Sequence, residues 1–340
     1  MRRAGAVVAA VVVALAIGGC GTEAPGDGEG NLDGQITVSN HPSLLYSPPW
    51  IAALDEDLFA KRGLKVSNIV GSEGGGTTVQ NVVSGGLPIG EVATSAAVTA
   101  FLAGADIKIV GGGVASGKDV FWVTNPDSDI DSIEDLRDKE VGYTSPGSVT
   151  QGLLALSLER SGVGLDNVKT RAMGGLAEGL TALKNGDIDA AAMLEPIFSE
   201  QVEEEGWKPV FRASDHVPEF MSTVIITGPG VAEKSPDLVK ETLAARAEGI
   251  EVVADRPKEV AKAWAKEAGI KESSALRALE SVDPDVHWKV GLGEPEGLES
   301  VLETMRLIDL LGNDQKVDWE KIVDQRFIPE SDRTALPESN

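Results

Sequence analysis

Few side chains in this sequence are of the types that act as nucleophiles, general bases or metal ligands. Its 340 residues include three histidines, His41, His216 and His287, and one cysteine, Cys20. A lone cysteine excludes an intramolecular disulfide. Three histidines and one cysteine are too few to predict a Cys/His metal site. Thiol–imidazole catalysis would have to use Cys20, which ends an apolar N-terminal run. The sequence therefore predicts no metal and no cofactor, and it directs attention to polar groups suited to binding.

A cluster of hydroxyl groups follows a predicted strand at 141–143 and precedes a helix predicted to run to about Ser161. Pro146 just inside the helix start and Gly147 in the turn leave backbone N–H groups pointing outward, and the helix dipole adds a partial positive charge. Such a helix start suits an oxyanion without a cationic side chain. The alternative is that the hydroxyls only cap their own helix. The candidate binding residues of this segment are Ser145, Ser148, Val149 and Thr150.

Two further candidate positions also follow predicted strands. Ser95 and Ala96 come after the strand 89–92, where a hydroxyl and free N–H groups at a helix start suit an anionic group. The alternative is again simple capping. Met173 ends another strand and is a candidate for a pocket wall, whereas Arg171 on the same strand face is expected to face solvent.

The remaining candidates are a carboxylate and three aromatic side chains. Glu195 follows the predicted strand 188–193 and would favour an amine or another donor on a ligand, unless it is a surface or hinge residue. The loop after the first strand carries His41, Tyr46 and Trp50, which can stack on a ligand or cap a pocket. The alternative for Trp50 is packing beneath its own helix.

These candidates lie between elements that alternate along the chain. Helices are predicted between short strands, and the strands lie at 36–39, 64–70, 89–92, 107–111, 141–143, 168–173, 188–193 and 224–227. This order is typical of an α/β fold with a mainly parallel sheet. Residues 83–93 resemble residues 183–191, since each segment is a helix end, a glycine and a short buried strand. Two related lobes would explain this similarity, and a cleft between lobes is a usual place for a small ligand.

The charge and the N-terminal segment restrict partners and location. With 30 Lys and Arg against 54 Asp and Glu, the net charge is −24. This charge argues against binding to nucleic acid and against docking on anionic lipid through a basic surface. The apolar run from Ala4 to Ile17 is shorter than a membrane span of about 20 residues and suits an export signal. Residues 20–34 are Gly-rich and acidic and predict a flexible tether.

The end of the apolar run, Ile17-Gly18-Gly19-Cys20, resembles the lipobox of bacterial lipoproteins. This resemblance implies a signal peptide at 1–19, cleavage before Cys20 and a lipid on the Cys20 thiol. The protein would then be extracytoplasmic and lipid-anchored to the cell membrane. The alternative is an ordinary signal peptide with an incidental cysteine.

Three stretches resemble the solute-binding proteins of ABC importers in the nitrate/sulfonate/taurine family. They are WIAALDEDLFAKRGLKV at 50–66, the segment 183–192 followed by Glu195-Pro196, and ADRPKEVA at 254–261. The resemblance implies an α/β type II periplasmic-binding-protein fold with a ligand cleft between two lobes. The expected boundaries are 35–122 plus 226–330 for lobe 1, 123–225 for lobe 2 and 331–340 for a C-terminal tail.

The same resemblance implies a binding protein rather than an enzyme. We expect a monomer that bends at hinges near 123–125 and 225–227 and closes over a small organic anion, such as a sulfonate, taurine or nitrate. It would deliver this ligand to a membrane permease and its ATPase. Two alternatives stay open: an enzyme of pyrimidine-precursor or menaquinone biosynthesis on the same fold, with His41 near the cleft, and a sensor lipoprotein without a permease.

Overall fold

The computed structural model describes residues 35–338, with the exception of residue 85. The predicted signal peptide at 1–19, the predicted lipidation site Cys20 and the predicted tether at 20–34 lie outside the described residues. Within the described part, no helix is both long enough and apolar enough to cross a bilayer.

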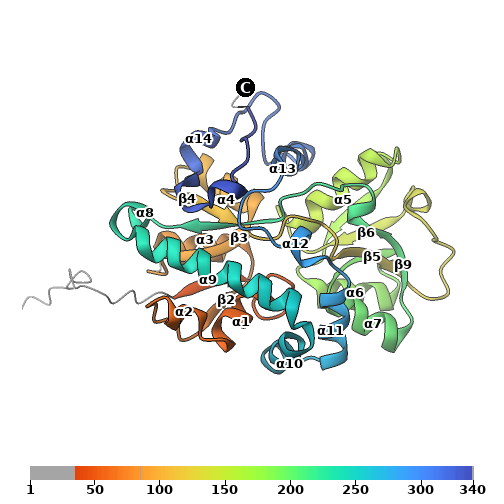
Figure 1. Ribbon diagram of the computed structural model, residues 1–340. Coiled ribbons are helices and arrows are strands. Elements are labelled where there is room, and N and C mark those ends of the chain that lie inside the picture. Colours follow the sequence, from red (N-terminus) through yellow and green to blue (C-terminus); the bar gives the residue numbers. More distant parts are fainter. Residues whose placement is uncertain (1–34, 85, 339–340) are drawn as a thin grey trace, which may run out of the picture. The chain divides into compact units, whose positions relative to one another are not determined.

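Ten strands form two five-stranded sheets in the described residues (Figure 1). The first sheet has the order β2-β1-β3-β10-β4, and the second has the order β7-β6-β8-β5-β9. The strands of the first sheet are β1 (Ile36–Ser39), β2 (Ile69–Ser72), β3 (Ile89–Ala93), β4 (Lys108–Gly112) and β10 (Thr223–Thr227). Those of the second are β5 (Val120–Thr124), β6 (Glu140–Tyr143), β7 (Lys169–Ala172), β8 (Ala190–Leu194) and β9 (Lys208–Arg212). We refer to each sheet with its neighbouring helices as lobe 1 and lobe 2.

Helices connect the strands and cover the sheets. Those before β10 are α1 (Pro48–Asp55), α2 (Leu58–Lys61), α3 (Gly75–Val83), α4 (Thr94–Leu102), α5 (Val149–Arg160), α6 (Leu176–Asn185) and α7 (Ile197–Glu205). Those after β10 are α8 (Val231–Lys234), α9 (Pro236–Asp255), α10 (Pro257–Ala268), α11 (Glu272–Glu280), α12 (Pro284–His287), α13 (Pro295–Leu307) and α14 (Trp319–Ile322). In Figure 1 the long helix α9 runs beside α1 and α2, while α5, α6 and α7 belong to lobe 2.

Each sheet is mixed, whereas the sequence predicts a mainly parallel one. β1 pairs in parallel with β2 and β3, and β6 with β7 and β8, but β10 and β5 each run antiparallel to both of their neighbours. The reason is topological, because β5 and β10 are the strands by which the chain enters lobe 2 and returns to lobe 1. A strand that is buried on both faces is an apolar run of residues whether its neighbours are parallel or antiparallel. The sequence therefore does not reveal this reversal.

The chain passes between the sheets slightly earlier than the sequence suggests. It leaves the first sheet after Gly112 and enters the second at Val120, and it returns between Arg212 and Thr223. The hinges predicted near 123–125 and 225–227 therefore fall at or inside β5 and β10. The irregular crossing segments 113–119 and 213–222 directly precede these strands.

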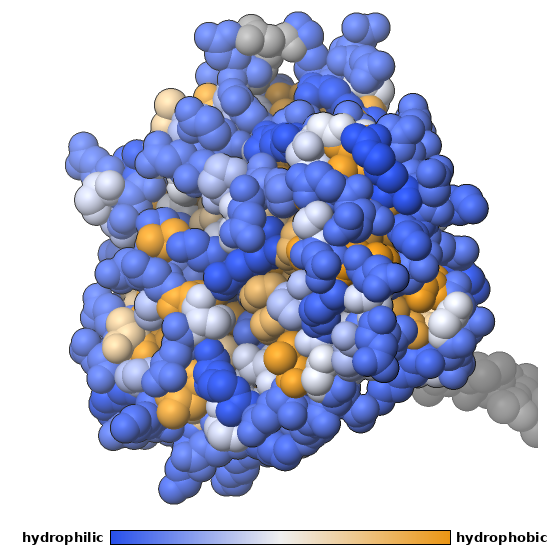
Figure 2. All heavy atoms as spheres, turned by 90° about the vertical axis from the view of Figure 1, so that its right-hand side faces the viewer, coloured by the Kyte–Doolittle hydropathy of each residue, from blue (hydrophilic) through white to orange (hydrophobic). Residues whose placement is uncertain are grey.

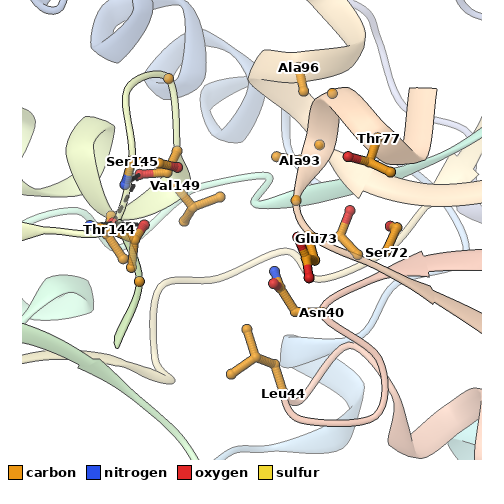
Figure 3. A pocket seen from close by; sticks show the side chains of 18 of the residues that line it. Asn40, Leu44, Ser72, Glu73, Thr77, Ala93, Ala96, Thr144, Ser145 and Val149 are labelled. Carbon is orange, nitrogen blue, oxygen red and sulfur yellow. Dashed lines mark hydrogen bonds between the residues drawn. The ribbon is translucent and has the colours of Figure 1, made fainter. Parts of the chain in front are cut away.

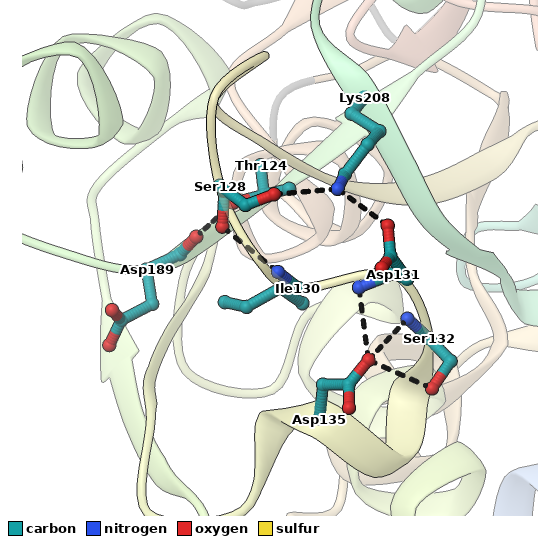
Figure 4. A network of polar contacts seen from close by, with 8 residues as sticks. All are labelled: Thr124, Ser128, Ile130, Asp131, Ser132, Asp135, Asp189 and Lys208. Atoms are coloured by element: carbon teal, nitrogen blue, oxygen red, sulfur yellow. Dashed lines mark hydrogen bonds and ion pairs between the residues drawn. The ribbon is translucent and has the colours of Figure 1, made fainter.

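The surface is mostly polar, and a long loop of lobe 2 is held by polar contacts. Among the described residues, Val286 is the large hydrophobic side chain that is exposed. Figure 2 accordingly shows mostly hydrophilic side chains on the face that carries lobe 2. The long loop after β5 is pinned by Lys208, whose ammonium donates to the Ser128 carbonyl and to the Asp131 carboxylate, both at 2.7 Å (Figure 4). These contacts fix the part of lobe 2 that leads into β6.

Candidate ligand-binding site

A cavity of about 1300 Å³ lies between the two lobes and opens to solvent. Lobe 1 contributes the ends of β1 and β2 and the starts of α3 and α4, and lobe 2 contributes residues 144–150, the start of α6, Leu194 and Ile197. Figure 3 shows Asn40, Glu73 and Thr77 on one wall and Thr144, Ser145 and Val149 on the other. The pocket therefore forms where strands end and helices begin. Parallel strands end at the same edge of a sheet, and the crevice outside this edge is the usual place for a ligand.

The starts of α3, α4, α5 and α6 line this pocket, and Ile197, the first residue of α7, lies at its edge. The first N–H groups of a helix have no partner within the helix, and the aligned peptide dipoles place about half a positive charge at each start. The starts of α3 and α4 touch, because a Cβ atom on Gly75 would lie only 2.5 Å from the Cβ of Ala96. Glycine at position 75 thus allows two positive helix ends to meet in one wall.

Some of the polar groups at the start of α5 are hydrogen-bonded to one another. The Ser148 hydroxyl accepts the Gln151 N–H at 3.2 Å and lies 3.0 Å from the Thr150 hydroxyl. The Gln151 side chain in turn accepts the Gly147 N–H at 2.7 Å. The Ser148 hydroxyl therefore serves as the cap of α5, whereas the Thr150 hydroxyl accepts the Thr144 N–H at 3.0 Å. The N–H groups of Val149 and Thr150 find no acceptor among the described residues and are the donors left for a ligand.

Ser95 and Ala96 have different surroundings. The Ser95 hydroxyl donates to the Gly147 carbonyl at 3.1 Å, which joins the start of α4 in lobe 1 to the loop before α5 in lobe 2. Ser95 is 9% exposed and lies behind the lining, whereas Ala96 lines the pocket directly. This hydrogen bond is a direct contact between the lobes beside the cavity.

His41 and Tyr46 both line the pocket with side chains that are almost buried. The His41 Nε2 atom lies 2.8 Å from a Glu267 carboxylate oxygen, and its Nδ1 atom has no partner. Burial raises the pKa of Tyr46 far above its usual value, and the charges of Asp119 and Glu91 act in the same direction. Tyr46 is therefore a neutral phenol at every physiological pH.

Trp50 does not reach the pocket. Its ring is fully buried, and its Nε1–H donates to a Glu91 carboxylate oxygen at 2.6 Å. The same carboxylate accepts the Thr223 hydroxyl at 2.7 Å and lies 3.3 Å from Nε of the buried Arg246. Trp50 therefore packs beneath its own helix, which is the alternative raised from the sequence. Its indole N–H donates to the carboxylate of a buried ion pair.

Glu195 and Met173 also lie outside the lining. Glu195 is 1% exposed, and it accepts the N–H and the hydroxyl of Ser199 at 3.2 and 2.9 Å. Burial raises its pKa, and the bonds from Ser199 oppose this shift. Met173 packs against Gly142 and Gly179 in the smaller hydrophobic core of lobe 2. The strands that carry them do end at the cavity, but the side chains turn into the protein.

Several lining residues have no counterpart among the sequence candidates. Asn40, Glu73, the glycines at 74–76 and Glu178 all line the pocket. The signal that could have found them is the strand–glycine–helix pattern at 69–77, which is the same pattern that identifies the α5 segment. Arg171 is exposed and pairs with Glu140 at 3.1 Å, so it brings no cation to the pocket.

A buried carboxyl group lies close behind the pocket, at the crossing into β5. Asp119 is 1% exposed, and neither of its carboxylate oxygens has a hydrogen-bond partner. Burial raises the pKa of Asp119 to about 7; the backbone N–H of Asp119 itself opposes the shift, Glu195 adds to it and Arg212 opposes it. In the part of the chain that the structure describes, no group of three or more acidic, histidine or cysteine side chains is arranged to hold a metal ion.

Comparisons with known proteins bear on the fold and the family. The model of the family described as NMT1/THI5 like matches residues 46–260. A comparison with curated protein sequences finds no match.

Solved structures match over nearly the whole chain. The periplasmic aliphatic sulphonate binding protein SsuA from Escherichia coli is 20% identical, with 88% of this chain and 93% of that chain covered and a TM-score of 0.72. The alkanesulfonate-binding protein SsuA from Xanthomonas axonopodis pv. citri, bound to MOPS, is 18% identical over 83% of this chain and 92% of that chain, with a TM-score of 0.67. The desulfurization enzyme DSZB is 14% identical over 86% and 97%, with a TM-score of 0.61. This likeness confirms the expected α/β type II periplasmic-binding fold with two lobes.

Proposed function

Because the chain belongs to the NMT1/THI5-like family, we propose that it is an extracytoplasmic solute-binding protein of an ABC importer. Its ligand is a small organic anion. The observation that carries this proposal is the convergence of four helix starts on one cavity between two lobes. Backbone N–H groups and helix dipoles bind an oxyanion by hydrogen bonding and charge, and no reacting group is needed.

Binding couples to closure of the lobes about the crossing segments 113–119 and 213–222. Two contacts between the lobes would help to hold a closed form. Ser95 bridges to Gly147 at 3.1 Å, and Arg277 of α11 pairs with Glu203 of α7. A ligand that occupies both walls adds its own contacts to this set. Differential affinity for the closed form is what drives the change.

The ligand contacts proposed for this chain come from both walls. His41, Tyr46 and Ala96 face the cavity from lobe 1, and Ser145, Ser148, Val149 and Thr150 face it from lobe 2. The closed protein would then dock on a membrane permease with its ATPase, tethered by a lipid on Cys20.

A single variant tests whether the start of α5 binds the anion through its N–H groups. Val149 is the first residue of α5, and Ser148 before it has φ −73° and ψ 161°, an extended conformation that a following proline accepts. Val149→Pro therefore deletes one N–H donor at a helix position where proline is favoured. Loss of a charge-assisted hydrogen bond costs about 1.5–3 kcal/mol, which weakens binding by about tenfold or more. Val149→Ala keeps the N–H group and is the matched control.

The ligand class is tested by thermal unfolding of the full chain with nitrate, alkanesulfonates, aminoalkanesulfonates, carboxylates and pyrimidines. A ligand at 100 times its Kd adds about 2.7 kcal/mol to the free energy of unfolding, a shift of several degrees. A shift with an oxyanion class, reduced by Val149→Pro and retained by Val149→Ala, supports the proposal. No shift with any compound refutes it.

An enzyme is the second candidate, because the chain also shares its fold with DSZB. His41 would be the general base, since it is the described histidine that lines the cavity. Turnover of a bound compound that is abolished by His41→Ala would establish this alternative, whereas unchanged ligand after prolonged incubation would exclude it for that compound.

A further inference from the structure

Two pairs of helices join the lobes beside the cavity, and they do so by different chemistry. In one pair α13 packs against α5, and in the other α11 packs against α7 (Figure 1). The cavity lies between these pairs, since its lining includes Ile197 at the start of α7 and Leu310 just beyond the end of α13. The two contacts differ in how easily they can separate when the lobes move.

The contact between α13 and α5 is closely packed and buried. All residues of α5 from 152 to 158 are buried, so α5 is covered by α13 as well as by the sheet of lobe 2. A Cβ atom on Gly152 would lie 2.9 Å from the Thr304 Oγ1 atom and 3.0 Å from the Thr304 Cβ atom. Arg160 at the end of α5 adds an ion pair with Glu303 of α13 at 2.8 Å. This contact is costly to separate, because separation exposes buried surface to water.

The links between α13 and lobe 1 are weaker. At its start, the Gly297 carbonyl accepts the Met221 N–H of the crossing segment 213–222 at 3.1 Å. Gly293, just before α13, has φ +67°, a conformation that favours glycine. Residues 312–316 beyond α13 are all exposed and lead to α14, which packs on β4. α13 touches α4 of lobe 1 over a smaller area than it touches α5. It is therefore built to turn about the crossing segments together with α5.

The contact between α11 and α7 is polar and exposed. None of the residues of α7 is buried. The buried face of α11 packs on α10, so α11 reaches α7 with charged side chains. Lys271 pairs with Glu204 and Arg277 pairs with Glu203, and all four side chains are at least 38% exposed. Exposed ion pairs contribute little to stability and are screened by salt, so this edge can open at low cost.

We propose that α13 moves with α5 as part of lobe 2, and that the lobes separate at the α7–α11 edge, which the two ion pairs close. The cavity then opens on the side of Ile197. Leu310 keeps its place in the wall of lobe 2, because a Cβ atom on Gly147 would lie only 3.3 Å from its side chain. This inference rests on the part of the proposed function in which the lobes open and close, and it does not depend on the identity of the ligand.

Distances between pairs of spin labels on the full chain test this proposal without a ligand. One pair, Glu205→Cys with Ser273→Cys, spans the α7–α11 edge. A second pair, Glu159→Cys with Glu299→Cys, spans α5 and α13. A third pair, Ser67→Cys with Glu299→Cys, measures the position of α13 against lobe 1. All five positions are exposed.

All variants also carry Cys20→Ser, so that only the introduced cysteines are labelled. The edge is weakened by 1 M NaCl, which shortens the screening length to about 3 Å, or by Lys271→Gln with Arg277→Gln. Under either condition we expect the 205–273 distance to lengthen and the 67–299 distance to change, each by more than the width of its low-salt distribution. The 159–299 distance should stay the same. Arg171→Gln, which removes an exposed ion pair within lobe 2, is the matched control and should alter none of the three distances.

The contrary results are equally defined. A 159–299 distance that lengthens together with the 205–273 distance would show that α13 stays with lobe 1 and would overturn the inference. A constant 67–299 distance beside a longer 205–273 distance has the same meaning. If no distance changes under either condition, the ion pairs do not close a moving edge, and the inference fails. The proposed function is tested separately, so a thermal shift with an oxyanion and constant distances would leave a binding protein whose lobes do not separate at this edge.

Discussion

Replacing Asp119 by asparagine should change the pH dependence of stability in a defined direction. The carboxyl group is 1% exposed and has no hydrogen-bond partner, and its pKa is raised from 3.8 to about 7, chiefly by burial. The folded state therefore holds a proton that the unfolded chain releases between about pH 4 and pH 7. The stability that this proton contributes is fully present below about pH 4 and is lost as pH rises through about 7.

The magnitude follows from the shift. About 3 pKa units at about 1.4 kcal/mol each correspond to about 4 kcal/mol of destabilisation above pH 7. Asparagine resembles the protonated acid and cannot ionise, so Asp119→Asn should escape this cost. We expect the variant to match the wild type near pH 4 and to be more stable by about 3–4 kcal/mol at pH 8. The corresponding rise in Tm is about 6 °C for a chain of this size.

The lowered pKa of His287 changes the stability with pH in the opposite direction, and the measurement must account for it. Burial, with Arg212, Lys118 and Arg246 nearby, lowers its pKa to about 3. Its contribution to stability is therefore lost as pH falls from about 6.5 through 3. In the wild type the two slopes offset each other between about pH 4 and 6.5. In Asp119→Asn acidification should destabilise the protein by up to about 1.4 kcal/mol per pH unit more steeply.

Urea unfolding at pH 4, 5, 6, 7 and 8, followed by tryptophan fluorescence, measures these differences. The control is Asp127→Asn, a change of the same type at an exposed aspartate of the following loop. The difference in stability between this variant and the wild type should not vary with pH. A stability difference between Asp119→Asn and wild type that does not grow with pH would refute the reasoning. A variant that is less stable at pH 8 would show that the carboxylate has a partner in solution.

Two further changes test the buried ion pair and the helix cap. Arg246→Met should leave the Glu91 carboxylate buried and without its cation, and urea unfolding should show a loss of about 3–5 kcal/mol; a loss below 1 kcal/mol would mean that Glu91 is protonated or solvated. Ser148→Ala should remove the cap of α5 and lower the free energy of unfolding by about 1 kcal/mol. Ser145→Ala should have little effect on stability, since the Ser145 hydroxyl makes no hydrogen bond with the described residues, and equal losses in both serine variants would contradict the cap assignment.

The sequence by itself determined many of the helices and strands through local signals, but it predicted no strand at β5 (Val120–Thr124) or β9 (Lys208–Arg212). Predicted strands at 107–111 and 168–173 correspond to β4 at 108–112 and β7 at 169–172. The hydroxyl, proline and glycine pattern at 145–150 correctly indicated a helix start, but the helix begins at Val149, so Pro146 lies in the turn before it and not just inside it. Such signals depend on backbone preferences and side-chain capping within a few residues, so they can be read from the chain alone. The segment at 50–61 shows the limit, since the structure divides it into α1 and α2.

Only the tertiary structure decided which candidate side chains reach the cavity. Trp50 follows the expected pattern, yet it is buried against Glu91, which lies 41 residues further along the chain and which no local rule identifies. Glu195 is bound by Ser199, only four residues away, but its burial depends on the packing of lobe 2. Conversely, Glu73 lines the cavity because β2 ends beside β1, which places it next to Asn40.

The same distinction explains the sheets and the pocket. Strand direction and pairing depend on contacts between residues far apart in sequence, so the reversal of β5 and β10 is invisible in a local pattern. The approach of α3 to α4 depends on Gly75 meeting Ala96, two residues on separate helices. The starts of α3, α4, α5 and α6 line one pocket because the fold brings the two lobes together. Sequence thus specifies each helix start, while long-range burial and pairing determine that they share a cavity.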